Sequence, residues 1–220
     1  MNMFSTLRAG FAAMLDTILP RRERRVRTEA RRLEDIPLSP MPHDLLGARI
    51  VTLMEYQNPE VEDLIRSLKY DGSAYAARLA AAVLADYLRE EIASSHTFSA
   101  RKILIVPVPL HKSRSRERGW NQIELVLRAL PEEFHDGTIA TLAPHALARA
   151  RATKPQTRLP RSERLSNVAG AFACPDLSLV EKTHIFLIDD VTTTGATLAN
   201  AATPLRRAGA NVTLLALARA

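Results

Sequence analysis

The chain has 220 residues, of which 46% are hydrophobic and 25% are charged, the usual proportions of a soluble globular protein. Seven arginines and two glutamates within residues 21–32 supply most of the formal net charge of +6, and the rest of the chain is nearly balanced. The basic charge is therefore weak evidence for a nucleic-acid-binding protein. The length suits one α/β domain with a short appendage.

The single cysteine, Cys174, excludes an intramolecular disulfide and a thiolate-rich zinc site. A lone cysteine fits a reducing compartment, so we expect a cytoplasmic protein. The longest unbroken apolar run, residues 79–85, is far shorter than the roughly 20 residues of a membrane span. We therefore expect no transmembrane segment.

Residues 1–47 are predicted to form an N-terminal helical, arginine-rich appendage. Apolar residues recur at helical spacing near its start, which predicts an amphipathic helix packed on the body of the protein. A membrane-surface helix or an organellar address is the alternative. The arginine run is interpreted as a solvated helix face, with a contact to nucleic acid as the alternative. Three prolines between residues 37 and 42 predict a loop.

From residue 48 onward, the sequence alternates between strand and helix patterns. Short apolar runs predict strands at Ile50–Met54, Lys102–Leu110, His184–Ile188 and Asn211–Leu217. Helical spacing predicts helices from Asn58 to the break at Asp71, from there to about Ile92, at Trp120–Leu130, near Arg161–Asn167 and at Ala196–Arg207. Such alternation is typical of an α/β fold with an open, mainly parallel sheet and flanking helices, here in one domain covering residues 48–220.

The segment Ile185–Thr197 combines features that suit a sugar phosphate. Four apolar residues form a strand buried on both faces, and Asp189 and Asp190 follow at its carboxyl end, where open α/β sheets bind ligands. A turn of small residues and threonines then leads into a helix, whose first N–H groups and dipole attract an anion. The acids would accept hydrogen bonds from ribose hydroxyls while the turn holds a phosphate.

This segment resembles the motif with which type I phosphoribosyltransferases bind phosphoribosyl diphosphate (PRPP). The resemblance implies that the acid pair holds the ribose hydroxyls and that the turn holds the 5′-phosphate. The residues assigned to PRPP binding are Asp189, Asp190, Thr192, Thr193, Thr194, Gly195, Ala196 and Thr197. The alternatives are an acid pair that only caps a helix and a threonine-rich turn without a ligand.

Further motifs resemble those of the ComF family, over roughly residues 48–220. They are Tyr56, Leu68–Tyr70, Val106–Leu110, Arg118–Gln122 and the stretch from Arg149 to Gln156, which continues through Arg164, Asn167, Ala171 and Phe172. Members of that family usually begin with a cysteine-rich zinc-binding segment. This chain has no cysteine at the corresponding residues 15–22. The resemblance therefore implies a member that lacks the zinc-binding cysteines.

Two basic stretches are expected to complete the site. Pyrophosphate gains negative charge as it leaves, so cations aimed at it stabilise the transition state. The resemblance implies that the loop after Pro109 is the pyrophosphate loop, with a solvated basic turn as the alternative; it contains Lys112, Arg114, Arg116 and Arg118. Residues 149–167 would be a flexible loop that closes over the sugar, with an exposed surface loop as the alternative. It contains Arg149, Arg151, Lys154, Gln156, Arg164 and Asn167.

The resemblance implies an enzyme that transfers ribose 5-phosphate from PRPP to an unidentified, nucleobase-like acceptor and releases pyrophosphate. Its catalytic residues would be Asp189, Asp190, Arg116, Arg118 and Arg151. Mg²⁺ is expected to arrive with the diphosphate and not in a protein cage. The alternative is a non-catalytic PRPP- or nucleotide-binding accessory protein linked to DNA uptake, since the family is associated with competence. Nucleic acid and a second copy of the chain are the other partners considered.

Overall fold

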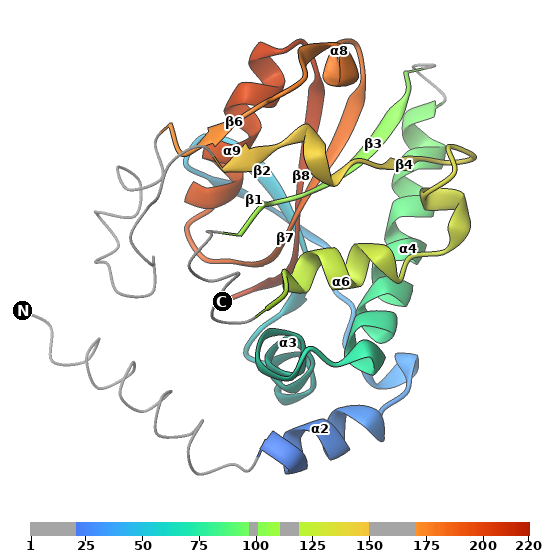
Figure 1. Cartoon of the computed structure of the whole chain (residues 1–220). Helices are drawn as coiled ribbons and strands as arrows, with labels where there is room; N and C mark the ends of the chain where they lie inside the picture. Colours follow the sequence, from blue (N-terminus) through green and yellow to red (C-terminus); the bar gives the residue numbers. More distant parts are fainter. Residues whose placement is uncertain (1–20, 97–100, 111–118, 150–169) are drawn as a thin grey trace, which may run out of the picture.

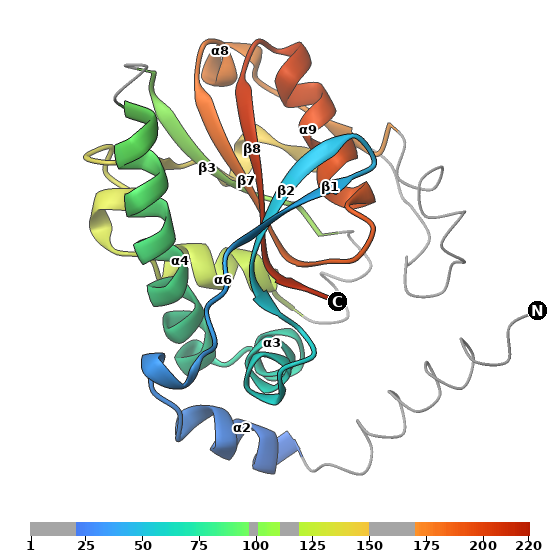
Figure 2. The same ribbon diagram turned by 180° about the vertical axis from the view of Figure 1, so that it is seen from behind.

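The computed structural model describes residues 21–96, 101–110, 119–149 and 170–220 (Figure 1). A six-stranded sheet forms the centre of this part of the chain, and helices cover both of its faces (Figures 1 and 2). The predicted α/β fold, an open and mainly parallel sheet with flanking helices, is thereby confirmed. It is consistent with a phosphoribosyltransferase-like fold.

The strands of the sheet stand in the order β1-β2-β8-β7-β3-β4. Neighbouring strands are parallel except at one edge, where β1 and β2 form an antiparallel hairpin. The strands are β1 (Met41–Leu45), β2 (Ala48–Glu55), β3 (Ile103–Pro107), β4 (Thr141–Leu142), β7 (His184–Thr192) and β8 (Asn211–Arg219). Because helices pack on both faces of the sheet, the apolar residues of β7, which lies between β3 and β8, are buried on both sides.

Two apolar cores lie on the two faces of the sheet. The first core lies under α3 (Pro59–Asp71), α4 (Ala74–His96) and α6 (Gln122–Arg128). The second lies under α9 (Ala196–Arg207), α8 (Leu177–Val180) and the short pair β5 (Ala148–Arg149) and β6 (Phe172–Ala173). Short 3-10 helices occupy Leu33–Asp35, Glu132–Phe134 and Pro144–Ala146.

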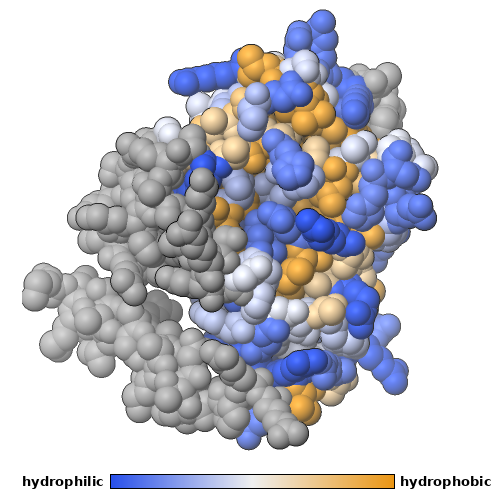
Figure 3. Space-filling view, in the orientation of Figure 1, coloured by the Kyte–Doolittle hydropathy of each residue, from blue (hydrophilic) through white to orange (hydrophobic). Residues whose placement is uncertain are grey.

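Side chains along β7 alternate between these cores, as the pleat of a strand requires. Ile185 and Leu187 belong to the core under α9, whereas Phe186 and Ile188 belong to the core under α3, α4 and α6. The same alternation directs Asp190 toward α3 and α6. On the outer face drawn in Figure 3, apolar residues lie in separate groups between hydrophilic ones.

Most of the predicted elements that fall within the described residues are confirmed, with changed ends. Helix α9 has the predicted bounds, and α3 begins after Asn58 and ends at Asp71, before Gly72, which has a left-handed φ of 56°. Strand β7 is longer than predicted, because its ladder with β8 continues to Thr192. The acid pair therefore lies within the strand and not behind it. The helix predicted near residues 161–167 lies outside the described residues.

The predicted proline-rich loop was wrong in its last part. Strand β1 begins at Met41 and includes Pro42, at the edge of the sheet where a proline is tolerated. This strand lies on the N-terminal side of the boundary that the sequence suggested after residue 47. The division of the chain into an appendage and a domain at that point remains a prediction.

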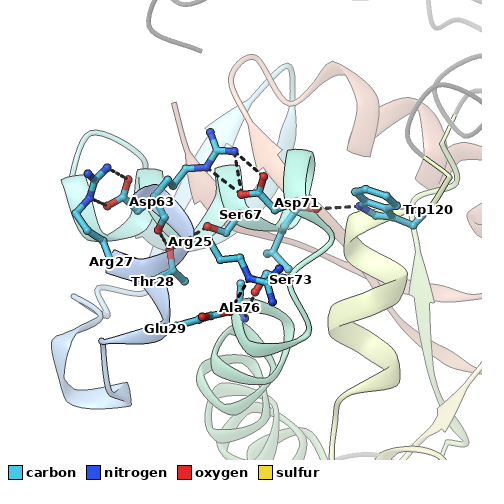
Figure 4. Close-up of polar contacts among 12 residues, drawn as sticks. Arg25, Arg27, Thr28, Glu29, Asp63, Ser67, Asp71, Ser73, Ala76 and Trp120 are labelled. Atoms are coloured by element: carbon cyan, nitrogen blue, oxygen red, sulfur yellow. Dashed lines mark hydrogen bonds and ion pairs between the residues drawn. The ribbon is translucent and has the colours of Figure 1, made fainter. Parts of the chain in front are cut away.

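Most of the arginine run forms helix α2 (Arg21–Glu29). We expected its arginines to be solvated, but one side of the helix packs against α3. Arg24 makes a two-pronged ion pair with Asp71 of α3, and both side chains are at most 7% exposed. Arg27 bonds to Asp63 of α3 at 3.0 and 3.1 Å, and Figure 4 shows the two side chains facing each other. Arg25, in contrast, is exposed. Much of the positive charge of α2 is thus neutralised within the protein.

Candidate functional site

The carboxyl ends of the parallel strands meet at one edge of the sheet, and the acid pair lies there. Asp189 and Asp190 are consecutive residues near the carboxyl end of β7, so their side chains point to opposite faces of the sheet. Asp189 is half-buried, while Asp190 is only 7% exposed. The two neighbouring carboxyl groups therefore have different surroundings.

Asp190 is held by three donors from three parts of the fold. Gln122 Nε2, in the first turn of α6, donates to Asp190 Oδ2 at 2.7 Å. Lys69 Nζ, in the last turn of α3, lies 3.2 Å from the same oxygen. The backbone N–H of Val191 donates to Oδ1 at 2.7 Å. Both oxygens of this buried carboxylate are thus bound by the protein itself.

These contacts separate the pKa values of the two acids. Burial alone would raise the pKa of Asp190, but the charge of Lys69 and the hydrogen bond from Gln122 outweigh burial and hold it below the ordinary 3.8. Burial, and after it the negative charge of Asp190, raise the pKa of Asp189 to about 8. Asp190 is therefore the more acidic member of the pair, and Asp189 holds its proton more tightly.

A tryptophan ties the two helices that supply these donors. Trp120 Nε1 donates to the carbonyl of Leu68 at 3.0 Å, next to Lys69 (Figure 4). The indole also lies against Gly72, where an added Cβ would stand 3.1 Å from the ring. Asn121 caps α6 by accepting from the N–H of Ile123 at 3.2 Å. The end of α3 and the start of α6 are therefore fixed relative to each other beside Asp190.

The turn after β7 leads directly into α9, and the N–H of Ala196 donates to Thr194 Oγ1 at 3.4 Å. Gly195 is the N-cap of α9 with a left-handed φ of 77°. An added Cβ there would stand 2.6 Å from Ile50 Cδ1 and 2.9 Å from Leu45 Cβ, so β1 and β2 leave room only for glycine. Thr192 is buried, Thr193 is exposed and Thr194 is half-buried. The first N–H groups of α9, from Ala196 and Thr197, thus begin directly beside exposed threonine.

The predicted site residues fall into two groups. The structure brings together the acid pair and the turn of residues 192–197 at the carboxyl end of β7. Arg149 lies in β5, where its guanidinium stacks on Phe172 with 5.0 Å to the ring centroid. The remaining predicted residues lie outside the described residues: Lys112, Arg114, Arg116, Arg118, Arg151, Lys154, Gln156, Arg164 and Asn167.

Two residues of the site were not predicted from the sequence, namely Lys69 and Gln122. Both stand within the stretches that resemble the ComF family, but no role followed from that resemblance. The sequence offered only their positions: Lys69 lies in the last turn of one predicted helix, and Gln122 lies in the first turn of another. Only the parallel sheet shows that both helix ends meet at Asp190.

The described residues contain no group of three or more histidine, cysteine or acidic side chains that could hold a metal ion. The acid pair alone is a poor fit to a resident metal, because Lys69 already occupies Asp190 Oδ2. None of the helices in the described ranges is long and apolar enough to cross a bilayer.

Comparison with known proteins gives relatives over most of the chain. The DNA utilization protein YhgH of Escherichia coli (strain K12) is 34% identical over 164 residues, which are 74% of this chain and 67% of that protein. The competence protein ComFC of Streptococcus pneumoniae is 30% identical over 70% of this chain and 60% of its own length. ComFC of Bacillus subtilis is 36% identical over 52% and 43%. No protein-family model matches the chain.

The sheet and its flanking helices define an α/β protein with a mainly parallel sheet, which is consistent with a phosphoribosyltransferase-like fold. Within this class, the chain belongs to the ComF family, that of the YhgH and ComFC proteins.

Proposed function

We propose that this protein binds PRPP and transfers its ribose 5-phosphate to an acceptor, with release of pyrophosphate. The observation that carries the proposal is the acid pair of β7, followed within five residues by a glycine-capped helix start. A carboxyl group accepts from hydroxyls, and a helix start binds phosphate, so the pair suits a ribose phosphate.

Each part of this site has a separate task in binding. The N–H groups at the start of α9 and the hydroxyls of the turn hold the 5′-phosphate, where the helix dipole is favourable. Asp189, half-buried at the strand end, faces the ribose hydroxyls. Asp190 is kept in place by Lys69 and Gln122, so that the neighbouring backbone does not shift when the ligand binds.

In the transfer step, a ring nitrogen of the acceptor forms a bond to C1 of the ribose as the bond from C1 to the diphosphate oxygen breaks. The electron pair leaves with pyrophosphate, positive charge develops on the sugar, and the ring nitrogen loses its proton, which an oxygen of the departing pyrophosphate takes up. Arg116 and Arg118 are the residues that we assign to the departing charge. Mg²⁺, bound to the diphosphate, would neutralise part of that charge. Exclusion of water by the segment around Arg151 would protect the sugar from hydrolysis.

A second function is favoured by one observation, the names of the relatives. A DNA utilization protein and two competence proteins suggest an accessory role in the use of DNA, in which PRPP or a nucleotide is sensed without chemistry. Such a sensor needs the same binding site but no stabilisation of a leaving group. The two functions therefore differ in what the arginine loop does.

The test is incubation of the full chain with PRPP, Mg²⁺ and a panel of nucleobases, followed by assay of released pyrophosphate. For an enzyme, replacing Arg116 and Arg118 together by alanine should lower the single-turnover rate by about 10²–10³-fold and PRPP affinity much less. A sensor would release no pyrophosphate with any nucleobase and would lose affinity alone. Equal losses of rate and affinity would contradict the catalytic assignment of this loop.

A further inference from the structure

Lys69 and Gln122 converge on a single oxygen of Asp190, in the interior of the site. The ion pair of Lys69 is shielded, since its side chain is 20% exposed and that of Asp190 10%. Gln122 is 3% exposed and donates to Asp190 Oδ2 at 2.7 Å, closer than Lys69. The positive charge at this carboxylate is therefore a built part of the fold.

An ammonium in this position changes what the acid pair can bind. A divalent cation needs carboxylate oxygens with free lone pairs, and it is repelled by a neighbouring positive charge. Asp190 Oδ2 already accepts from two donors, and Oδ1 accepts from the N–H of Val191. Asp189 Oδ1 accepts from the N–H of Asp190 at 2.9 Å, so Asp189 Oδ2 is the carboxyl oxygen of the pair that remains for a ligand.

A second observation concerns Gln122, on the face of β7 toward which Asp190 points. Gln122 Oε1 is buried and has no hydrogen-bond partner among the described residues. Buried acceptors in proteins are almost always hydrogen-bonded, so this oxygen is expected to meet a donor when the site is filled. Its amide is oriented by the bond from Nε2 to Asp190, which leaves an acceptor and not a donor for the ligand.

We propose that Lys69 is a resident cation of the acid pair, which keeps Asp190 as a structural carboxylate and prevents the pair from holding a metal ion of its own. The site then takes a ligand through neutral donor groups, which can meet Asp189 on one face of β7 and Gln122 Oε1 on the other. Lys69 and Gln122 are positioning residues in this account, since they act through Asp190. That the donors are ribose hydroxyls rests on the proposed function, whereas the resident cation does not.

The test uses Mn²⁺ alone, titrated into the full chain without PRPP and followed by calorimetry and by electron paramagnetic resonance. Wild type should show no saturable site at the acid pair below about 1 mM. Lys69→Met should bind Mn²⁺ at least tenfold more tightly, because the pair loses its cation. Lys69→Arg, which keeps the charge, should behave as wild type. The double variant Lys69→Met with Asp190→Asn should lose the new site, and circular dichroism should show all variants folded.

Two results would overturn the resident cation. One is a wild-type Mn²⁺ site as tight as that of Lys69→Met, and the other is a folded Lys69→Met variant that gains no site. A separate titration of wild type with PRPP and Mg²⁺ keeps the two proposals apart. If wild type does not bind PRPP but the variants bind Mn²⁺ as expected, the proposed function is contradicted and the role of Lys69 still stands.

Discussion

Asp189 and Asp190 are adjacent in sequence, yet the strand directs them into unlike surroundings. One is an anion with a cation and an amide on its oxygens, and the other is an acid whose pKa rises to about 8. Such divergence is common where a binding site and not the core sets the residue types. It also makes the stability of the ligand-free protein depend on pH.

The Asp189→Asn variant tests this difference. The folded pKa of Asp189 lies above its ordinary 3.8, so the folded state binds its proton more tightly than the unfolded state. Its contribution to the free energy of unfolding is fully present below about pH 4 and is lost as pH rises through about 8. As the pH rises from 5 to 8, the free energy of unfolding of the variant, measured with urea, should increase by ~2 kcal/mol relative to that of wild type. Parallel pH dependence of the two proteins would contradict the raised pKa.

At Gly195, the backbone conformation and the close neighbours of the turn both require glycine. Gly195→Ala should destabilise the protein by roughly 2–4 kcal/mol, because a left-handed φ is combined with close contacts to β1 and β2. Gly47→Ala is the matched control, since Gly47 has a φ of 72° but nothing within 4 Å of the added Cβ. It should cost about 1 kcal/mol. Equal losses in urea unfolding would mean that the contacts with Leu45 and Ile50 are unimportant.

Among the elements, α2 and α3 form an unusually polar contact. Besides the two sets of ion pairs, Thr28 Oγ1 and Ser67 Oγ share a buried hydrogen bond of 2.9 Å. Beyond this pair of helices, Tyr75 OH of α4 donates at 2.6 Å to the carbonyl of Arg31, which follows α2. Since α3 also carries Lys69, the arginine-rich helix braces the element that supplies the cation of the site.

Substitutions of two neighbouring arginines of α2 distinguish the effect of the buried ion pair from the effect of the positive charge of the helix. Arg24→Ala should lower the free energy of unfolding by about 3 kcal/mol, because it leaves the buried carboxylate of Asp71 without its partner. Arg25→Ala removes the same charge from an exposed position and should leave stability nearly unchanged. Thermal unfolding of both variants checks this. Similar behaviour of the two would show that α2 does not depend on the pair with Asp71.

Elements with a strong local pattern could be predicted from the sequence, and those defined by distant partners could not. The apolar run of β7 and the spacing in α9 identify both elements without knowledge of the rest of the fold. Strand β1 was not predicted, because Pro42 and the prolines before it are typical of a loop. Only its pairing with β2 shows that it is a strand. The contact of Gln122 with Asp190 spans 68 residues of sequence, and only the order of the strands brings them together. The acid pair was thus predictable, but its cation was not.

For the whole molecule, the parallel sheet gathers the turn, the acid pair and both positioning residues at one edge. The sheet alone does not determine a function, because many activities share such folds. The central claim is that this edge binds PRPP, and calorimetric titration of the full chain with PRPP in the presence of Mg²⁺ tests it most directly. We predict a micromolar dissociation constant, roughly −8 kcal/mol, and weaker binding by Asp189→Asn. Absence of binding heat with millimolar PRPP would contradict the claim.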